Sequence, residues 1–322
     1  MGKIYVAGHR GLVGSAIVRQ LIALGTNPND ILTKTHAEMD LKDRNAVDNF
    51  FSSNDIEQVY MAGAKVGGIV ANNTYPAEFI YENLTMQTNV IHNAYRRGIK
   101  KLLMLGSTCI YPRECPQPID EEYLLTGHLE KTNDAYAIAK IAGLKMCEAY
   151  HRQYGVDYRS VMPSNIYGIN DNFHPENNHL VAGVIGRIYA AKQRGDRQVV
   201  IWGTGTPRRE FLYCDDMARG CITVMNADKA LFDSVASSYR AVNLGPGYDI
   251  TINELFEKVC DIIGFKGEIL HDNTRPDGTM AKLTDITRIT KLDWKPIISL
   301  DEGLKRTYFW YEENLNKGII RR

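Results

Sequence analysis

Short apolar runs alternate along the first half of the chain with longer stretches of helical period. In chain order, the predicted strand and helix pairs are 4–7 with 13–24, 58–64 with 79–96, and 101–106 with 135–154, followed by a strand over 158–163. Parallel strands require crossover connections, which are usually helices, so this alternation indicates βαβ units. The sequence therefore predicts an α/β fold built on a doubly wound parallel sheet of the Rossmann type.

The alternation becomes irregular after residue 168. The pattern predicts a loop over 168–178, a helix over 180–193, a strand over 198–202, and further apolar segments over 240–244 and 251–263. We expect a Rossmann domain over 1–168 with returning segments near 212–245. A smaller α/β substrate domain is expected mainly over 169–322, so the chain crosses between the two domains more than once.

Composition narrows the class of partner. The 322 residues contain 38 basic and 38 acidic side chains without a clustered basic block, which argues against a nucleic-acid or membrane partner. Six scattered cysteines without a CxxC pair argue against a disulfide scaffold and a metal site. The chain shows neither a signal-peptide pattern nor an apolar run of the roughly 18 residues that a membrane helix needs. We expect a soluble, cytoplasmic protein.

A glycine-rich turn follows the first apolar run. Gly8, Gly11 and Gly14 form a GxxGxxG pattern that also contains Arg10, Leu12 and Val13, and this pattern opens onto a predicted helix. Glycine permits the tight turn and the close approach of a pyrophosphate to the helix N-terminus. The position favours dinucleotide binding over the alternative, an ordinary tight turn.

The end of the second predicted strand bears on cofactor choice. An acidic residue there would accept a hydrogen bond from the ribose 2′-hydroxyl of NAD, but the segment offers Lys34 and His36 instead. Together with Arg10 they make three cationic or potentially cationic groups suited to a 2′-phosphate. The sequence predicts NADP(H), while the alternative is that these are surface residues of a loop.

Tyr136 and Lys140 stand four residues apart within a predicted helix, so both side chains share one face. An ammonium group near a phenol favours the phenolate, which would lower the pKa of the tyrosine. Ser107 lies at the end of the strand over 101–106, where parallel topology brings strand ends to a ligand crevice.

The glycine-rich turn, the strand-end serine and the YxxxK pair, in this order, resemble the short-chain dehydrogenase/reductase family in its extended, nucleotide-sugar-modifying branch. Further segments, at 60–69, 163–168, 172–175, 208–211 and 276–279, resemble the GDP-L-fucose synthases over essentially the whole chain. Two positions depart from this pattern, because Lys34 and His36 stand where arginines are expected.

The resemblance implies roles for individual residues. It assigns reduction to Ser107, Tyr136 and Lys140, and proton exchange during epimerisation to Cys109 and His179. Cofactor contacts are implied for Lys140, Pro163, Ser164, Asn165, Ile166 and His179, and contacts to the GDP-sugar for Arg187, Trp202, Arg209, Asp277 and Lys282. Judged from chemistry alone, Cys109 reads as a core cysteine and His179 as a surface histidine. For Trp202, an indole can stack on a base, and the alternative is a core aromatic at a strand end.

The resemblance also implies an activity. We expect epimerisation of a GDP-linked 4-keto-6-deoxy sugar at C-3 and C-5, then NADPH-dependent reduction at C-4, by a homodimer packed through the helices over 79–96 and 135–154. A close alternative is a GDP-L-colitose synthase. More distant alternatives are a redox-neutral dehydratase or 4-epimerase and a non-enzymatic nucleotide sensor, against which Cys109 and the intact Ser107, Tyr136 and Lys140 argue.

Overall fold

The computed structural model describes the chain except residues 1, 175–177, 275–276, 316, 319 and 321–322. Its centre is a six-stranded parallel sheet with the strand order β10-β5-β4-β3-β1-β2. The strands are β1 (Lys3–Ala7), β2 (Ile31–Leu32), β3 (Ile56–Met61), β4 (Lys101–Leu105), β5 (Asp157–Pro163) and β10 (Ala241–Leu244). All seven residues of β5 are buried, as expected for a strand covered on both faces.

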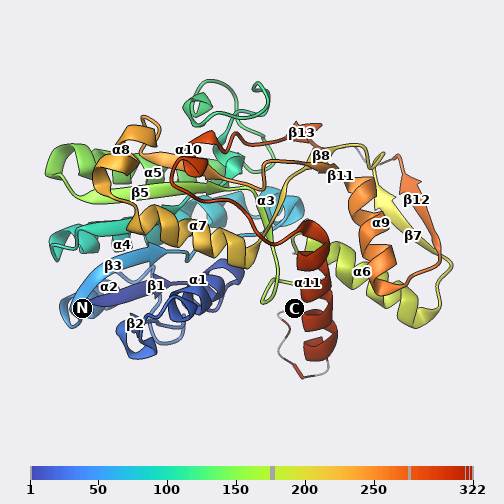
Figure 1. Cartoon of the computed structure of the whole chain (residues 1–322), viewed down its shortest axis with the longest axis horizontal. Coiled ribbons are helices and arrows are strands. Elements are labelled where there is room, and N and C mark those ends of the chain that lie inside the picture. Colours follow the sequence, from blue (N-terminus) through green and yellow to red (C-terminus); the bar gives the residue numbers. More distant parts are fainter. Residues whose placement is uncertain (1, 175–177, 275–276, 316, 319, 321–322) are drawn as a thin grey trace.

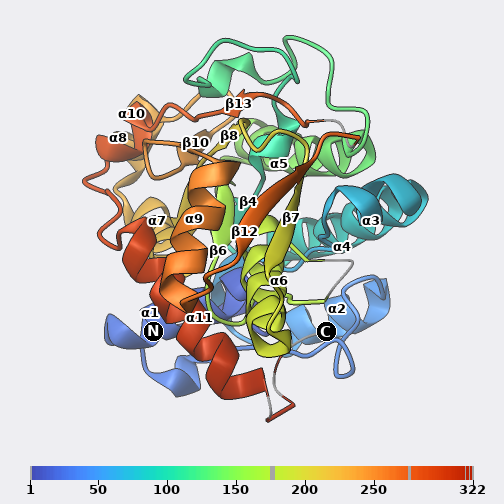
Figure 2. The same ribbon diagram turned by 90° about the vertical axis from the view of Figure 1, so that its right-hand side faces the viewer.

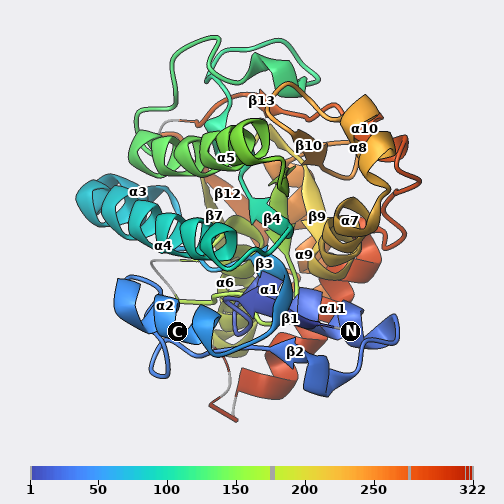
Figure 3. The ribbon, with the colours of Figure 1, turned by 90° about the vertical axis from the view of Figure 1, so that its left-hand side faces the viewer.

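Helices cover both faces of this sheet (Figures 1 and 3). One face carries α1 (Leu12–Ala23) and α7 (Cys214–Asn226), and the other carries α2 (Arg44–Ser52), α4 (Pro76–Arg96) and α5 (Asp134–Tyr154). Local sequence sets several of these boundaries. Pro76 occupies the first turn of α4, where its missing N–H costs no hydrogen bond, and α5 ends at Gly155 with a left-handed φ of 72°.

A smaller layered part lies beside the carboxyl edge of the sheet (Figure 2). Helices α6 (Leu180–Arg194) and α9 (Ile252–Ile263) pack beside the parallel pair β7 (Gln198–Trp202) and β12 (Glu268–Asp272), with α11 (Leu300–Leu315) against α9. A capping box at Thr251 and Glu254 starts α9. Shorter elements are α3 (Ile69–Thr74), α8 (Lys229–Val235), α10 (Thr287–Thr290), and the 3-10 turns η1 (Pro28–Asp30), η2 (Thr108–Ile110) and η3 (Glu121–Tyr123).

Two small strand ladders lie between these parts, and the three-stranded one is counted below, with α6, α9, α11, β7 and β12, as the smaller layer. In a three-stranded sheet, β8 (Arg208–Arg209) pairs with β11 (Ile250–Thr251) and with β13 (Ala281–Lys282). In the second ladder, β6 (Asn165–Tyr167) pairs in parallel with β9 (Phe211–Tyr213). The chain therefore leaves the main sheet after β5, builds part of the smaller layer, and returns through α7 to add β10.

The predicted α/β class and the doubly wound sheet are confirmed. The pattern did not predict α2, and the second strand is only the two residues Ile31 and Leu32, after which Lys34 and His36 lie in a loop. In the described part of the chain, no helix has both the length and the apolar character needed to cross a membrane.

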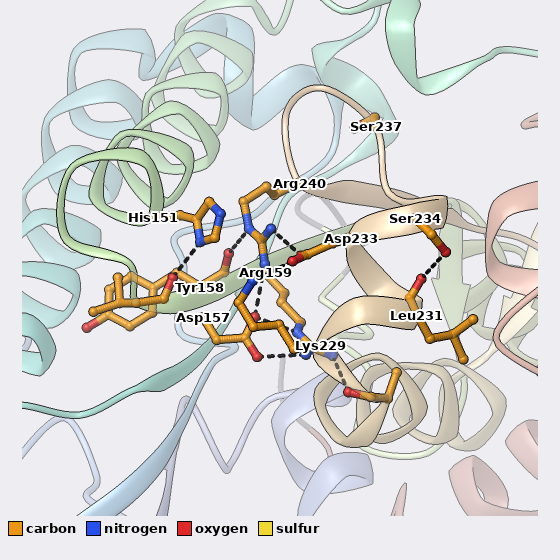
Figure 4. Close-up of polar contacts among 12 residues, drawn as sticks. His151, Asp157, Tyr158, Arg159, Lys229, Leu231, Asp233, Ser234, Ser237 and Arg240 are labelled. Carbon is orange, nitrogen blue, oxygen red and sulfur yellow. Dashed lines mark hydrogen bonds and ion pairs between the residues drawn. The ribbon is translucent and has the colours of Figure 1, made fainter.

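A buried cluster of charges joins β5 to the segment before β10 (Figure 4). Arg159 makes a bidentate ion pair with Asp157, and Arg240 donates to the same carboxylate at 2.9 Å and to Asp233 at 2.5 Å. Both guanidinium groups lie over the ring of Phe232. These contacts hold Arg240 at a left-handed φ of 54°, which is unusual for a residue with a side chain.

Replacement of Asp157 by alanine is expected to destabilise the fold by about 3–5 kcal/mol, because two buried guanidinium groups lose their shared partner. Replacement of Asp196, which pairs with Arg194 on the surface, serves as the control and should cost less than about 1 kcal/mol. Denaturant unfolding of both variants checks this. A loss for Asp157→Ala as small as that for Asp196→Ala would contradict the structural role of the cluster.

Candidate active site

The glycine-rich turn connects β1 to α1 at the carboxyl edge of the sheet. Gly8 has a left-handed φ of 78°, and a Cβ there would lie 2.7 Å from the backbone of Gly63. A Cβ on Gly14 would collide with the carbonyl group of Gly8, so helix and turn pack without room for side chains. Gly11 caps α1 without a side chain, so no side-chain acceptor competes for the N–H groups at the start of the helix.

The turn therefore fits the pyrophosphate of a dinucleotide, which accepts hydrogen bonds from helix N-terminal N–H groups. A second observation supports the fit at the end of β5. The Ser164 hydroxyl is buried and, within the described residues, has no hydrogen-bond partner, while Pro163 ends β5 beside it. Asn165 and Ile166 continue into β6, and the Asn165 side chain donates to the carbonyl oxygen of Glu210 at 2.9 Å.

Two of the three predicted cations share one acidic neighbour. Hydrogen bonds from Thr35 are the main cause of a lowered pKa of the Glu38 carboxyl group. Lys34 and Arg10 lie close enough to lower it further. The His36 side chain is largely exposed and lies 3.7 Å from Asp40. Glu38 was missed by the sequence reasoning, which considered only the residues directly after the strand.

Ser107, Tyr136 and Lys140 meet at the carboxyl end of β4. Ser107 caps η2, where its hydroxyl accepts from the Cys109 N–H at 3.2 Å, and its side chain also hydrogen-bonds that of Tyr136. Lys140 is buried, donates to the Leu105 carbonyl oxygen at 2.8 Å, and places its Nζ 5.8 Å from the centre of the Tyr136 ring. The sequence-predicted triad is therefore assembled in space.

One electrostatic expectation is wrong. Burial raises the pKa of Tyr136 above its usual value, and the nearby Cys109 thiol adds to that effect, while the hydrogen bond to Ser107 opposes it. Burial also lowers the pKa of Lys140 to about 8. Because desolvation dominates at both groups, the structure favours a protonated phenol, where the sequence argument expected a lowered tyrosine pKa.

Cys109 lies next to two cations from the smaller layer. Burial lowers the pKa of Arg209 and the Cys109 thiol opposes that shift, so the two side chains interact. Lys282 pairs with Arg209 across β8 and β13, and its Nζ reaches the carbonyl oxygen of Thr108 at 3.5 Å. These two cations therefore face the loop that carries Cys109, which is partly exposed and is not a core residue.

His179 caps the start of α6, with its Nδ1 at 3.4 Å from a carboxylate oxygen of the buried Asp171. A chain of contacts leads from this segment to the triad. Gly68 lies so close to the residue before His179 that a Cβ on it would be 2.9 Å from the Asn178 carbonyl oxygen. The adjacent Gly67 packs on Phe79. The Phe79 ring in turn packs edge-on against Tyr136, with ring centres 6.3 Å apart. Sequence reasoning also missed Asp171, because nothing in the local pattern marks it as buried.

The other predicted substrate residues lie on the smaller layer. Trp202 ends β7 with 59% of its surface exposed, so it is not the core aromatic that was the alternative. Arg187 donates to the Val200 carbonyl oxygen at 2.9 Å, which holds it beside the same strand. The Asp277 carboxylate accepts from the N–H and hydroxyl groups of Thr204, in the turn after Trp202. Pro175 and Pro276, in two of the matched segments, lie outside the described residues.

Comparison with known proteins places this geometry in a family. The NAD dependent epimerase/dehydratase family matches residues 4–245. A GDP-L-fucose synthase from Escherichia coli (strain K12) is 50% identical over 98% of this chain and 98% of its own length. A GDP-L-colitose synthase from Yersinia pseudotuberculosis is 34% identical over 97% of this chain and 99% of its own.

A solved structure agrees with these relatives. A GDP-L-fucose synthetase from Naegleria fowleri bound to NADP has a TM-score of 0.88 and 25% identity, covering 100% of this chain and 96% of its own. The chain belongs to the NAD dependent epimerase/dehydratase family and, within it, to the group of GDP-L-fucose synthases and their relatives.

Proposed function

We propose that this chain is an NADPH-dependent enzyme that epimerises GDP-4-keto-6-deoxy-D-mannose at C-3 and C-5 and then reduces C-4, giving GDP-L-fucose. The observation that carries the proposal is the meeting of Ser107, Tyr136 and Lys140 with Cys109, under two cations from the smaller layer. Reduction needs the first three groups, epimerisation needs a further proton-exchanging group, and a nucleoside diphosphate needs cations.

In the reduction, NADPH supplies the hydride to C-4, and the protein supplies the proton. Tyr136 donates that proton to the C-4 oxygen, and its raised pKa keeps the phenol protonated until negative charge develops on the sugar. Ser107 hydrogen-bonds the same oxygen. Lys140, anchored on the Leu105 carbonyl group, would hold the nicotinamide ribose, and the proton lost by Tyr136 is replaced from solvent.

In the epimerisation, the 4-keto group acidifies the hydrogen atoms on both neighbouring carbons. Cys109 and His179 exchange protons at C-3 and C-5, and Tyr136 and Ser107 stabilise the enolate oxygen that forms in each inversion. Asp171 orients the His179 imidazole through its Nδ1 and leaves Nε2 to exchange the proton. One pocket then serves both inversions and the reduction.

The nucleotide end of the substrate is assigned to the smaller layer. Arg209 and Lys282 neutralise the diphosphate, and the exposed indole of Trp202 stacks on the guanine. Arg187, bonded to the Val200 carbonyl oxygen, contacts the nucleotide from beside β7. The hydrogen bonds of Asp277 to Thr204 support a different role from the substrate contact implied by resemblance, namely fixing the turn beside Trp202. The parallel sheet over residues 1–168 with its returning segments would hold the cofactor.

The alternative product is a colitose nucleotide, whose precursor lacks one sugar hydroxyl group. The higher identity to a GDP-L-fucose synthase than to a GDP-L-colitose synthase favours the fucose reaction.

The assembly we propose is a homodimer packed through α4 and α5. These helices lie side by side on one face of the sheet (Figure 3). Tyr81 on α4 and Ile138 on α5 have exposed side chains. A cytoplasmic location fits the free thiol state of all six cysteines. Light scattering should give twice the monomer mass, and charged substitutions at Tyr81 and Ile138 should return the monomer. A wild-type monomer at micromolar concentration would contradict the dimer.

NADPH should be preferred to NADH through Arg10 and Lys34. Arg10→Ala is expected to lower kcat/KM for NADPH by about tenfold and to leave that for NADH nearly unchanged, because a charge-assisted contact to the 2′-phosphate is lost. Glu38→Gln should raise the preference for NADPH, since its carboxylate competes for the same two cations. Steady-state kinetics with both cofactors checks this, and equal effects of Arg10→Ala on the two would rule out the 2′-phosphate contact.

Cys109→Ser and His179→Gln should each lose solvent-deuterium exchange into the 4-keto sugar while retaining some hydride transfer to the unepimerised ketone. Cys115→Ser is the matched control, because Cys115 is also partly buried and close to Lys282. NMR of the sugar after incubation in D₂O without NADPH measures exchange at C-3 and C-5. Normal exchange in both variants, or none in wild type, would leave a reductase without an epimerase function.

A further inference from the structure

Glu210 occupies the junction between two small ladders. It is the single residue between β8, which carries Arg209, and β9, which pairs with the strand of Asn165. Its main-chain carbonyl oxygen accepts from the Asn165 side chain at 2.9 Å. Glu210 is therefore adjacent to Arg209 of the predicted diphosphate site. It is also hydrogen-bonded to Asn165, for which the resemblance implies a cofactor contact.

The Glu210 side chain points to the strand that bears the second cation. Glu210 is 1% exposed, and its Oε2 accepts from the Thr284 N–H at 2.8 Å and from the Thr284 hydroxyl at 2.9 Å. Thr284 is 2% exposed and stands two residues after Lys282. The carboxylate therefore ties the segment after β13 to the end of β8. This contact supports the register in which Lys282 lies opposite Arg209.

The backbone of Gly245 packs closely against this contact. A Cβ on Gly245 would lie 2.5 Å from the Thr284 hydroxyl oxygen and 2.6 Å from a Glu210 carboxylate oxygen. Burial raises the pKa of Glu210 to about 7, and the nearby charge of Asp249 adds to this increase. Hydrogen bonds from Thr284 and Gly247 oppose it. A buried acid without a cationic partner among these contacts is costly, and a leucine of similar size would avoid that cost.

We propose that Glu210 is a positioning residue for the nucleoside diphosphate: through Thr284 it sets Lys282 opposite Arg209, so that both cations reach the same diphosphate. The inference rests on the proposed function in one respect, that GDP is the nucleotide bound here. Glutamine keeps an acceptor for the Thr284 N–H and a donor for its hydroxyl oxygen, so the role requires the hydrogen bonds and not the charge.

Calorimetric titration with GDP and, separately, with NADPH tests the proposal on the full chain. Glu210→Ala should weaken GDP binding by about tenfold and change NADPH binding by less than about twofold, since one charged contact loses its geometry. Glu210→Gln should restore GDP binding. The matched control is Asp216→Ala, which removes another buried carboxylate that holds main-chain N–H groups, at Ile297 and Ile298. It should lower the thermal midpoint and leave GDP binding unchanged.

A double-mutant cycle identifies the route of the effect. Lys282→Ala should weaken GDP binding by itself, and adding Glu210→Ala to it should produce no further loss, because the first change has removed the group being positioned. Should Glu210→Ala fail to fold, Thr284→Val removes only the hydroxyl contact and should still weaken GDP binding selectively.

Three results would overturn the inference: unchanged GDP binding in Glu210→Ala, equal weakening of GDP and NADPH, or additive losses in the cycle. A wild-type chain that binds NADPH and not GDP would instead contradict the proposed function on which the inference rests. The two failures are therefore distinguishable within one set of titrations.

Discussion

Parallel strand pairing is the constraint on which the rest of this molecule depends. Six parallel strands align their carboxyl ends at one edge, so the residues that follow β1, β4 and β5 meet although they lie far apart in sequence. Gly8, Ser107 and Ser164 all occupy such positions. The first turns of α5 add Tyr136 and Lys140 at this edge. The close approach of Gly8 to Gly63, and of Gly14 to Gly8, brings α1 against the sheet. The chemistry is thus a consequence of topology, and no single segment contains it.

The smaller layer adds what the parallel edge lacks. Binding of a nucleoside diphosphate is favoured by cations that are already held in place, because ordering cationic side chains on mobile loops would cost conformational entropy and lower the affinity. Here Arg209 and Lys282 are register partners in a short sheet, and that sheet continues through Glu210 into the ladder formed by β6 and β9. The proposed sugar and cofactor sites would consequently be built on one hydrogen-bonded framework. Burial also shifts the two pKa values of the proposed reductive pair, raising that of Tyr136 and lowering that of Lys140.

Sequence reasoning predicted the elements that have a regular period. The apolar alternation located β1, β3, β4 and β5 with their helices to within a few residues, and the spacing of Tyr136 and Lys140 identified one helical face. It did not predict contacts between distant segments. The bond from Thr284 to Glu210 spans 74 residues, and that from Thr204 to Asp277 spans 73, so no local pattern encodes either of them. Burial was equally invisible: Asp171 and Glu210 look like surface acids in the sequence, and the raised pKa of Tyr136 follows from packing that only the fold defines.

The central claim is that one pocket performs two inversions and one reduction on the same sugar. The most direct test incubates the wild-type chain with NADPH and GDP-4-keto-6-deoxy-D-mannose and assigns the configuration of the product by NMR. We expect GDP-L-fucose, inverted at both C-3 and C-5, with one NADPH oxidised for each molecule formed. A product reduced at C-4 with its original configuration at C-3 and C-5, or no oxidation of NADPH, would contradict it.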